Sequence, residues 1–172
     1  ARAYVRSAPI RAGKPVLVRR LLEPALRRSP KDFVATTVDG VAISGTTVDL
    51  PREPERNTAG MAVLSMTREL RLDFGIELAI EKGIPLGSGL GGSAASAVAG
   101  VVAANALLPK SLSKLELLKS AMHGEQVASG SVHVDNIAPS LFGGLVLTVG
   151  IDNPNVKQIP VPPTVRCVLV HP

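Results

Sequence analysis

The sequence has few of the residues that several common classes of protein require. A single cysteine, Cys167, excludes an intramolecular disulfide framework and favours a reducing compartment such as the cytoplasm. The chain contains no tryptophan, one tyrosine and three phenylalanines, so a base-stacking surface for nucleic acid is hard to assemble. Its longest nearly apolar run, residues 94–108, is interrupted by Ser96 and Asn105 and is too short to span a bilayer. We therefore expect no membrane segment, and a nucleic-acid partner is disfavoured.

The positive charge is concentrated at one end of the chain. Residues 1–31 contain nine basic side chains and one acid, Glu23, whereas the remainder contains ten basic and thirteen acidic side chains. A basic segment can bind nucleic acid, but a solvated basic face is the simpler interpretation because aromatic residues are scarce. Hydrophobic residues make up 45% of the 172 residues, which is enough for the core of about one domain.

Hydrophobic periodicity and turn signals predict both strands and helices. Asp39-Gly40 is a hairpin signal, and Ser113 with Glu116 forms a capping box at the start of a helix. Residues 1–31 remain ambiguous. Strands are expected at residues 33–37, 41–48, 75–81, 145–149 and 165–170, the last two separated by a proline-rich loop, and helices at 58–72, after Ser93 and from near Lys114.

The most informative stretch is residues 84–100, which read IPLGSGLGGSAASAVAG. An expected strand precedes it, and a run of small apolar residues typical of a tightly packed helix follows its glycines. Glycines let a backbone approach a ligand closely, and the unpaired amides and dipole of a helix N-terminus favour an anion. The stretch therefore predicts a phosphate-binding loop, with a purely structural glycine turn as the alternative.

Two well-known phosphate motifs fit this loop poorly. A P-loop requires a lysine and then a serine or threonine after its last glycine, but here Ser93-Ala94 follow Gly92. The dinucleotide fingerprint is formally present at Gly87, Gly89 and Gly92. It requires an acidic residue about twenty positions later, and no acid occurs before Glu116.

The run from Pro85 to Ala95 resembles the phosphate-binding motif P-x-x-x-G-L-G-S-S-A of the GHMP small-molecule kinases. Gly92 stands where the family has its first serine, and Ser93 matches the second. The resemblance implies an α+β fold like the N-terminal domain of these kinases, which shares its architecture with domain 2 of ribosomal protein S5. It also implies that ATP phosphates bind at Pro85, Gly87, Ser88, Gly89, Leu90, Gly91, Gly92, Ser93 and Ala94.

Leu115, Leu118, Met122 and Glu125 follow helical spacing, which places the Glu125 carboxylate on the side of its helix that faces the protein. A buried carboxylate needs a cation, either a basic side chain or a metal ion. Beside a phosphate loop Mg²⁺ is favoured, because it binds one or two protein oxygens together with nucleotide phosphates. The resemblance agrees, and it implies that Ser93 and Glu125 hold this Mg²⁺.

The run SGSVHVDNIAP at residues 129–139 narrows the resemblance to GHMP kinases that phosphorylate the side-chain hydroxyl of L-homoserine in threonine biosynthesis. Some family members have a catalytic Asp where this chain has Asn136. An amide cannot act as a general base, so phosphoryl transfer would rely on positioning and electrostatic stabilisation. The resemblance implies that Asn136 and Glu125 are catalytic, that His133, Asp135 and Asn136 line the substrate pocket, and that Asn57 contacts adenine. A structural histidine is the alternative for His133.

We expect residues 1–172 to form one N-terminal ATP-binding domain of such a kinase, without its C-terminal domain. The short first motif of the family is not recognisable within residues 1–50. The expected partners are L-homoserine and ATP, and the sequence is compatible with a homodimer. Two alternatives remain: a GHMP kinase acting on a different small alcohol, and an S5-like RNA-binding module.

Overall fold

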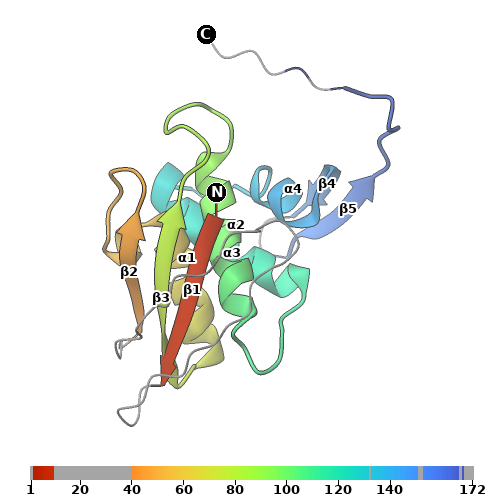
Figure 1. Ribbon diagram of the computed structural model, residues 1–172. Helices are drawn as coiled ribbons and strands as arrows, with labels where there is room; N and C mark the ends of the chain where they lie inside the picture. The colour runs from red at the N-terminus through yellow and green to blue at the C-terminus, as the bar shows by residue number, and fades with distance from the viewer. Residues whose placement is uncertain (1, 10–39, 132, 151–152, 167, 169–172) are drawn as a thin grey trace.

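The computed structural model describes residues 2–9, 40–131, 133–150, 153–166 and 168. Helices cover one face of a three-stranded sheet, and a separate two-stranded sheet lies beside the helices (Figure 1). This arrangement confirms the predicted α+β class. The elements are β1 (Arg2–Pro9), β2 (Val41–Thr46), η1 (Pro54–Arg56), α1 (Thr58–Leu70), β3 (Phe74–Glu81), α2 (Gly92–Asn105), α3 (Lys114–Ser129), α4 (Ile137–Phe142), β4 (Leu145–Val149) and β5 (Asn155–Ile159).

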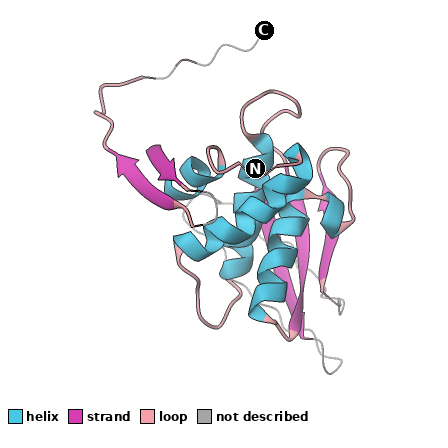
Figure 2. Cartoon of the chain, turned by 180° about the vertical axis from the view of Figure 1, so that it is seen from behind, coloured by secondary structure: helices cyan, strands magenta, loops and turns pink. Residues whose placement is uncertain are grey.

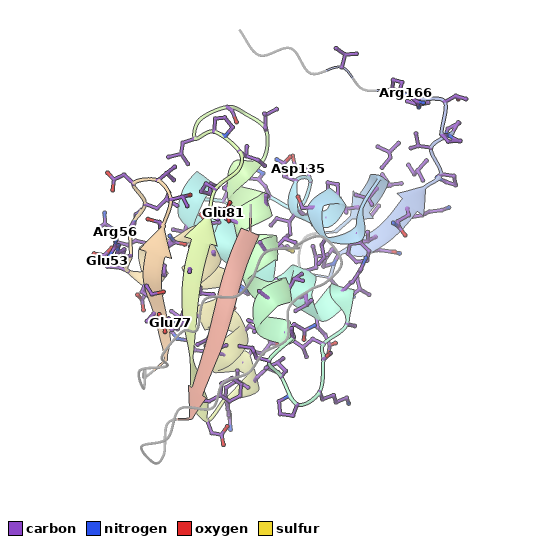
Figure 3. The ribbon with its side chains drawn as sticks, in the orientation of Figure 1. Glu53, Arg56, Glu77, Glu81, Asp135 and Arg166 are labelled. Atoms are coloured by element: carbon purple, nitrogen blue, oxygen red, sulfur yellow. The ribbon has the colours of Figure 1, made fainter. Side chains whose placement is uncertain are left out.

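The larger sheet has the order β1-β3-β2, with β1 antiparallel and β2 parallel to the central strand β3. Side chains alternate along β3: Ile76, Leu78 and Ile80 are buried beneath the helices. Glu77 and Glu81 occupy the opposite face of the strand (Figure 3). The predicted strand at residues 75–81 is therefore confirmed, and it ends where the glycine-rich stretch begins.

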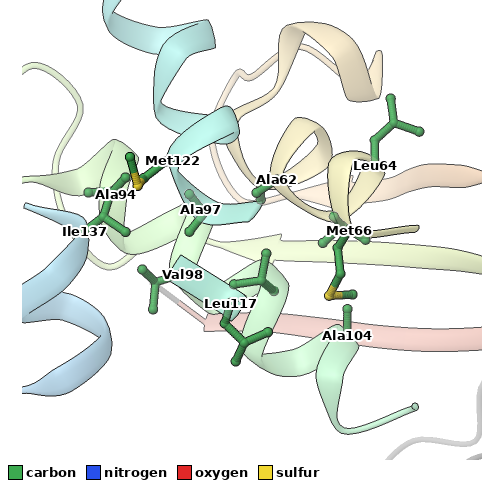
Figure 4. Close-up of a cluster of buried hydrophobic side chains, with 14 of the residues drawn as sticks. Ala62, Leu64, Met66, Ala94, Ala97, Val98, Ala104, Leu117, Met122 and Ile137 are labelled. Carbon is green, nitrogen blue, oxygen red and sulfur yellow. The ribbon is translucent and has the colours of Figure 1, made fainter. Parts of the chain in front are cut away.

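Helices α1 and α2 pack on one face of this sheet, and α3 packs against α1 and α2 (Figure 2). They approach closely because small residues lie between them. A Cβ atom at Gly124 would lie 2.4 Å from the Thr58 carbonyl oxygen, and one at Gly100 would lie 3.1 Å from that of Ala59. Figure 4 shows Ala94 of α2 and Met122 of α3 beside Ile137 of α4, and Met66 of α1 beside Ala104 of α2.

The ends of the helices follow from local chemistry. The Ser113 hydroxyl accepts a hydrogen bond from the Glu116 amide at 3.4 Å, and the Glu116 carboxylate accepts one from the Ser113 amide at 2.7 Å. This capping box confirms the predicted start of α3. Helix α1 ends at Leu70, two residues before the predicted end, because Arg71 adopts a left-handed conformation with φ of 50°.

The sequence-based assignment of the last strand was wrong. The partner of β4 is β5, whereas the described residues between 165 and 168 form no strand. Pro154 and Pro160 flank β5, and proline lacks the amide hydrogen that a strand interior needs. The five residues between them all retain that hydrogen, so they can pair. The proline-rich loop thus contains the strand.

The predicted strand at residues 33–37 and its hairpin turn lie outside the described residues, apart from Gly40. Leu115 is 49% exposed, so the buried stripe of α3 begins later, at Leu117 and Leu118. None of the helices in the described part of the chain combines the length and apolar character that crossing a bilayer requires.

Candidate functional site

Residues 82–91 join β3 to α2 and form the loop predicted to bind phosphate. Gly87, Gly89 and Gly91 have φ values of 70°, 71° and 67°. These values lie in the left-handed region, which glycine enters without the steric cost that a Cβ atom imposes. The alternation of glycines in the sequence is therefore what allows this loop conformation.

A side-chain hydrogen bond also stabilises this loop. The Ser88 hydroxyl donates a hydrogen bond to the Pro85 carbonyl oxygen at 2.8 Å, which closes the segment between them. Leu86 and Leu90 are 55% and 38% exposed, so they add nothing to the core of the described structure. The loop is thus an accessible surface and not a buried turn.

Helix α2 begins directly after this loop. Gly91 occupies the N-cap position and provides no side-chain hydrogen bond to the helix. The first turn is formed by Gly92, Ser93 and Ala94, whose amides have no acceptor within the helix itself. An anion placed here would accept hydrogen bonds from these amides and would be favoured by the helix dipole.

The structure brings the two predicted metal ligands together. The Ser93 hydroxyl in the first turn of α2 donates a hydrogen bond to Glu125 Oε1 in α3 at 2.9 Å. Glu125 is only 6% exposed, as its place on the protein-facing side of the helix predicted. The neighbouring Gly124 permits the close approach of α3 that makes this contact.

These two side chains fit a magnesium ion that also binds a nucleotide. The described residues contain no group of three or more His, Cys, Asp or Glu side chains that could enclose a metal ion. Ser93 and Glu125 offer a hydroxyl oxygen and a carboxylate, which are hard ligands suited to Mg²⁺. The remaining positions would go to phosphate oxygens and water, which is the usual way in which Mg²⁺ binds at nucleotide sites.

Lys82 is a site residue that the sequence analysis missed. Its ammonium group donates hydrogen bonds to the Gly92 carbonyl oxygen at 2.6 Å and to the Ser96 hydroxyl at 2.8 Å. Burial lowers the pKa of Lys82 from its ordinary value of 10.5, and the negative charge of Glu125 partly opposes this shift. The sequence feature that could have indicated Lys82 is its position between a predicted strand and the glycine loop.

Asn136 lies against the glycine loop. A Cβ atom at Gly91 would be 3.3 Å from Asn136 Oδ1, so these two segments nearly touch although they are far apart in sequence. Asn136 is exposed and immediately precedes α4. The structure thus places this predicted residue beside the start of α2, with its amide accessible.

His133 and Asp135 are less closely tied to the loop. His133 Nε2 lies 2.7 Å from the Ser131 hydroxyl, and both side chains are exposed. Asp135 is also exposed, near the end of the molecule that carries the glycine loop (Figure 3). Among the described residues, no hydrogen bond or ion pair joins His133 or Asp135 to the loop.

Asn57 caps α1. Its side-chain oxygen accepts hydrogen bonds from the amides of Ala59 and Gly60 at 3.0 and 3.1 Å, and its amide nitrogen donates one to the Pro51 carbonyl oxygen at 2.8 Å. The residue is 4% exposed. These contacts explain why an asparagine stands there, whereas its contact with adenine stays a prediction.

The glycine loop, the uncapped start of α2 and the Ser93–Glu125 pair lie together in an α+β domain. Residues 57–144, just over half of the chain, match the model for the GHMP kinases N terminal domain. The chain therefore belongs to the GHMP kinase family, as its motif predicted.

Within this family, the chain is similar to homoserine kinases. The chain is 48% identical over 160 residues to a homoserine kinase of Xanthomonas campestris pv. campestris (strain B100), covering 93% of this chain and 45% of that protein. It is 42% identical over 149 residues to a homoserine kinase of Chlorobium phaeobacteroides (strain BS1), covering 83% of this chain and 44% of that protein. The chain thus spans less than half the length of these relatives.

A solved structure is similar as well. The crystal structure of homoserine kinase from Cytophaga hutchinsonii ATCC 33406 matches with a TM-score of 0.66 and 45% sequence identity. The match covers 72% of this chain and 40% of that one. The predicted fold, that of the N-terminal domain of a GHMP kinase, is therefore confirmed.

Proposed function

We propose that the complete protein transfers the γ-phosphoryl group of ATP to the side-chain hydroxyl of L-homoserine, a step of threonine biosynthesis. The observation that carries this proposal is the pairing of Ser93 with Glu125 at the foot of the glycine loop. The similarity to homoserine kinases supports the choice of acceptor. The activity is assigned to the complete protein because this chain, proposed as its N-terminal ATP-binding domain, spans less than half the length of those relatives.

The phosphates of ATP would occupy the glycine loop. The backbone of residues 87–94 would surround them, and the first-turn amides of α2 would point toward their charge. Ser93 and Glu125 would hold Mg²⁺ beside the same phosphates. When bound, the metal ion supplies positive charge that stabilises the transferring phosphoryl group.

The acceptor would lie between the loop and the start of α4. Asn136 carries an amide and cannot remove the proton of the attacking hydroxyl, so its role would be to orient the substrate close to the phosphate. His133 and Asp135 would contact the amino-acid part of L-homoserine. Asn57 would contact adenine from the start of α1.

The decisive experiment is ADP release by the complete protein with magnesium-ATP and a panel of alcohols that includes L-homoserine and mevalonate. We expect release that depends on L-homoserine. Release with a different alcohol would keep the phosphate site and reject the acceptor. Absence of release with every alcohol, together with salt-sensitive RNA binding, would favour the S5-like RNA-binding alternative.

A further inference from the structure

Lys82 follows β3 directly, one residue after Glu81, which marks the end of this strand in Figure 3. Its ammonium group reaches into the first turn of α2, where it bonds the Gly92 carbonyl oxygen and the Ser96 hydroxyl. The Ser96 hydroxyl donates in turn to the same carbonyl oxygen at 3.0 Å. The three groups form a closed hydrogen-bonded triangle that links the strand to the helix.

A cation at this place is unfavourable for the helix itself. The N-terminus of a helix carries partial positive charge, so an ammonium group there is repelled by the dipole. The side chain also loses water, which is why its pKa is lowered. A departure of this kind from a local rule is expected at functional sites, where another interaction offsets it. The charge of Glu125 is one such interaction.

Gly92 lies directly beside this ammonium group. A Cβ atom at position 92 would lie 3.5 Å from Lys82 Nζ and 3.3 Å from Ile84 Cγ2. Gly92, whose carbonyl oxygen accepts from Lys82, immediately precedes Ser93, whose hydroxyl donates to Glu125. Any rotation of the first turn that broke the Lys82 contact would also move the Ser93 hydroxyl.

We propose that Lys82 is a positioning residue that fixes the first turn of α2, so that Ser93 and Glu125 stay aligned to hold magnesium-nucleotide. The inference rests on the proposed function for its ligand and on the hydrogen-bonded triangle for its mechanism. Lys82 acts on the site through the helix backbone and not through the titration of its own amine.

The first test measures backbone hydrogen exchange of the complete protein without nucleotide. Lys82→Met should speed exchange of the amides that close the first turn of α2, such as that of Ala95, which donates to the Gly91 carbonyl oxygen at 3.0 Å. The expected change is about tenfold, because a hydrogen bond from a charged group is lost. Ser96→Ala, which removes one acceptor, should have a smaller effect in the same segment. Lys157→Met, at an exposed lysine on β5, is the matched control and should leave the segment unchanged.

The second test measures the magnesium dependence of ADP binding. If Lys82 positions Ser93, Lys82→Met should raise the Mg²⁺ concentration for half-saturation by about tenfold, and Lys82→Arg should recover part of the loss. If Lys82 acted only as a nearby charge, removing it would favour the cation and lower that concentration. The direction of the change therefore separates positioning from simple electrostatics.

The outcomes separate this inference from the proposed function. Unchanged exchange and unchanged magnesium dependence in Lys82→Met, with normal binding by the wild-type protein, would overturn the role of Lys82 alone. Tighter Mg²⁺ binding in the variant would overturn it as well. A wild-type protein that does not bind magnesium-ADP would overturn both the proposed function and the role assigned here.

Discussion

The glycine-loop region and the β4–β5 hairpin differ in which side chains they bury. Around the loop, a carboxylate and an ammonium group are drawn into the protein and held by hydrogen bonds. On the hairpin, the outward face of β4 leaves apolar side chains in water: Leu145, Leu147 and Val149 are 53%, 52% and 65% exposed. Polar groups are buried in one region while apolar groups are exposed in the other.

The difference shows that polarity alone does not decide burial. Desolvating a charge is costly, so Glu125 is buried where hydrogen bonds and a cation are within reach. The outward face of β4 carries three apolar side chains, whereas its inner face carries Thr148 and Val146, of which Val146 packs on the core. We expect the loop region to dominate activity and the core beneath it to dominate stability, with the outward face of the hairpin contributing little.

The largest effect is expected from Glu125→Gln in the complete protein. The variant keeps the shape of the side chain but loses its charge, so magnesium-dependent turnover should fall at least about 100-fold, since metal stabilisation of the transferring group contributes several kcal/mol. Glu69→Gln, at an exposed carboxylate on α1, should retain turnover. Unchanged turnover in Glu125→Gln would show that the metal assignment is wrong.

Gly124→Ala tests the packing that brings α3 to the loop. Its new methyl group would lie 2.4 Å from the Thr58 carbonyl oxygen and 2.8 Å from Ala62 Cβ, so the helices must separate. We expect a loss of about 1–3 kcal/mol of unfolding free energy in urea denaturation. Gly83→Ala is the control, because nothing lies within 4 Å of a Cβ atom there. Equal stability of the two variants would contradict the close packing.

Ser113→Ala tests a local signal outside both regions. Loss of the N-cap should cost about 1 kcal/mol at neutral pH. The hydrogen bonds from Ser113 lower the pKa of Glu116 from its ordinary value of 4.5. Because the pKa of Glu116 is lower in the folded state than in the unfolded chain, its ionised carboxylate stabilises the folded state at pH values above the unfolded-state pKa. This stabilisation is lost as the pH falls through the folded-state pKa.

The difference in stability between the wild-type protein and Ser113→Ala should therefore shrink between about pH 7 and about pH 3 in urea denaturation. Ser111→Ala, at an exposed serine in the preceding loop, should show no such difference at either pH. A difference that stayed constant with pH would mean that the cap stabilises α3 without involving the Glu116 charge.

The smallest effect is expected on the outward face of the hairpin. Val149→Ala should change the unfolding free energy by less than about 0.5 kcal/mol, because the side chain is already 65% exposed. Val146→Ala, in the same strand but packed against the core, should cost about 1 kcal/mol. Equal costs would show that the outward face is covered in solution, and the contrast between the two regions would fail.

Structural features that depend on a few neighbouring residues could be predicted from the sequence. Alternating glycines predicted the loop, because a left-handed φ is set by each residue itself. The capping box placed the start of α3, and periodicity placed Glu125 on its buried side. The motif in the loop was sufficient to predict the family and the fold class.

Contacts between distant segments were decided only by the tertiary structure. Lys82 bonds Ser96, fourteen residues later, because α2 packs on the sheet, and Ser93 bonds Glu125, thirty-two residues later, because α3 packs against α2. The meeting of Asn136 with Gly91 depends on how α4 returns to the start of α2. The sequence by itself determined which residue types could form a phosphate site. Packing decided which of them meet, because these distances depend on how whole helices approach one another and not on local conformation.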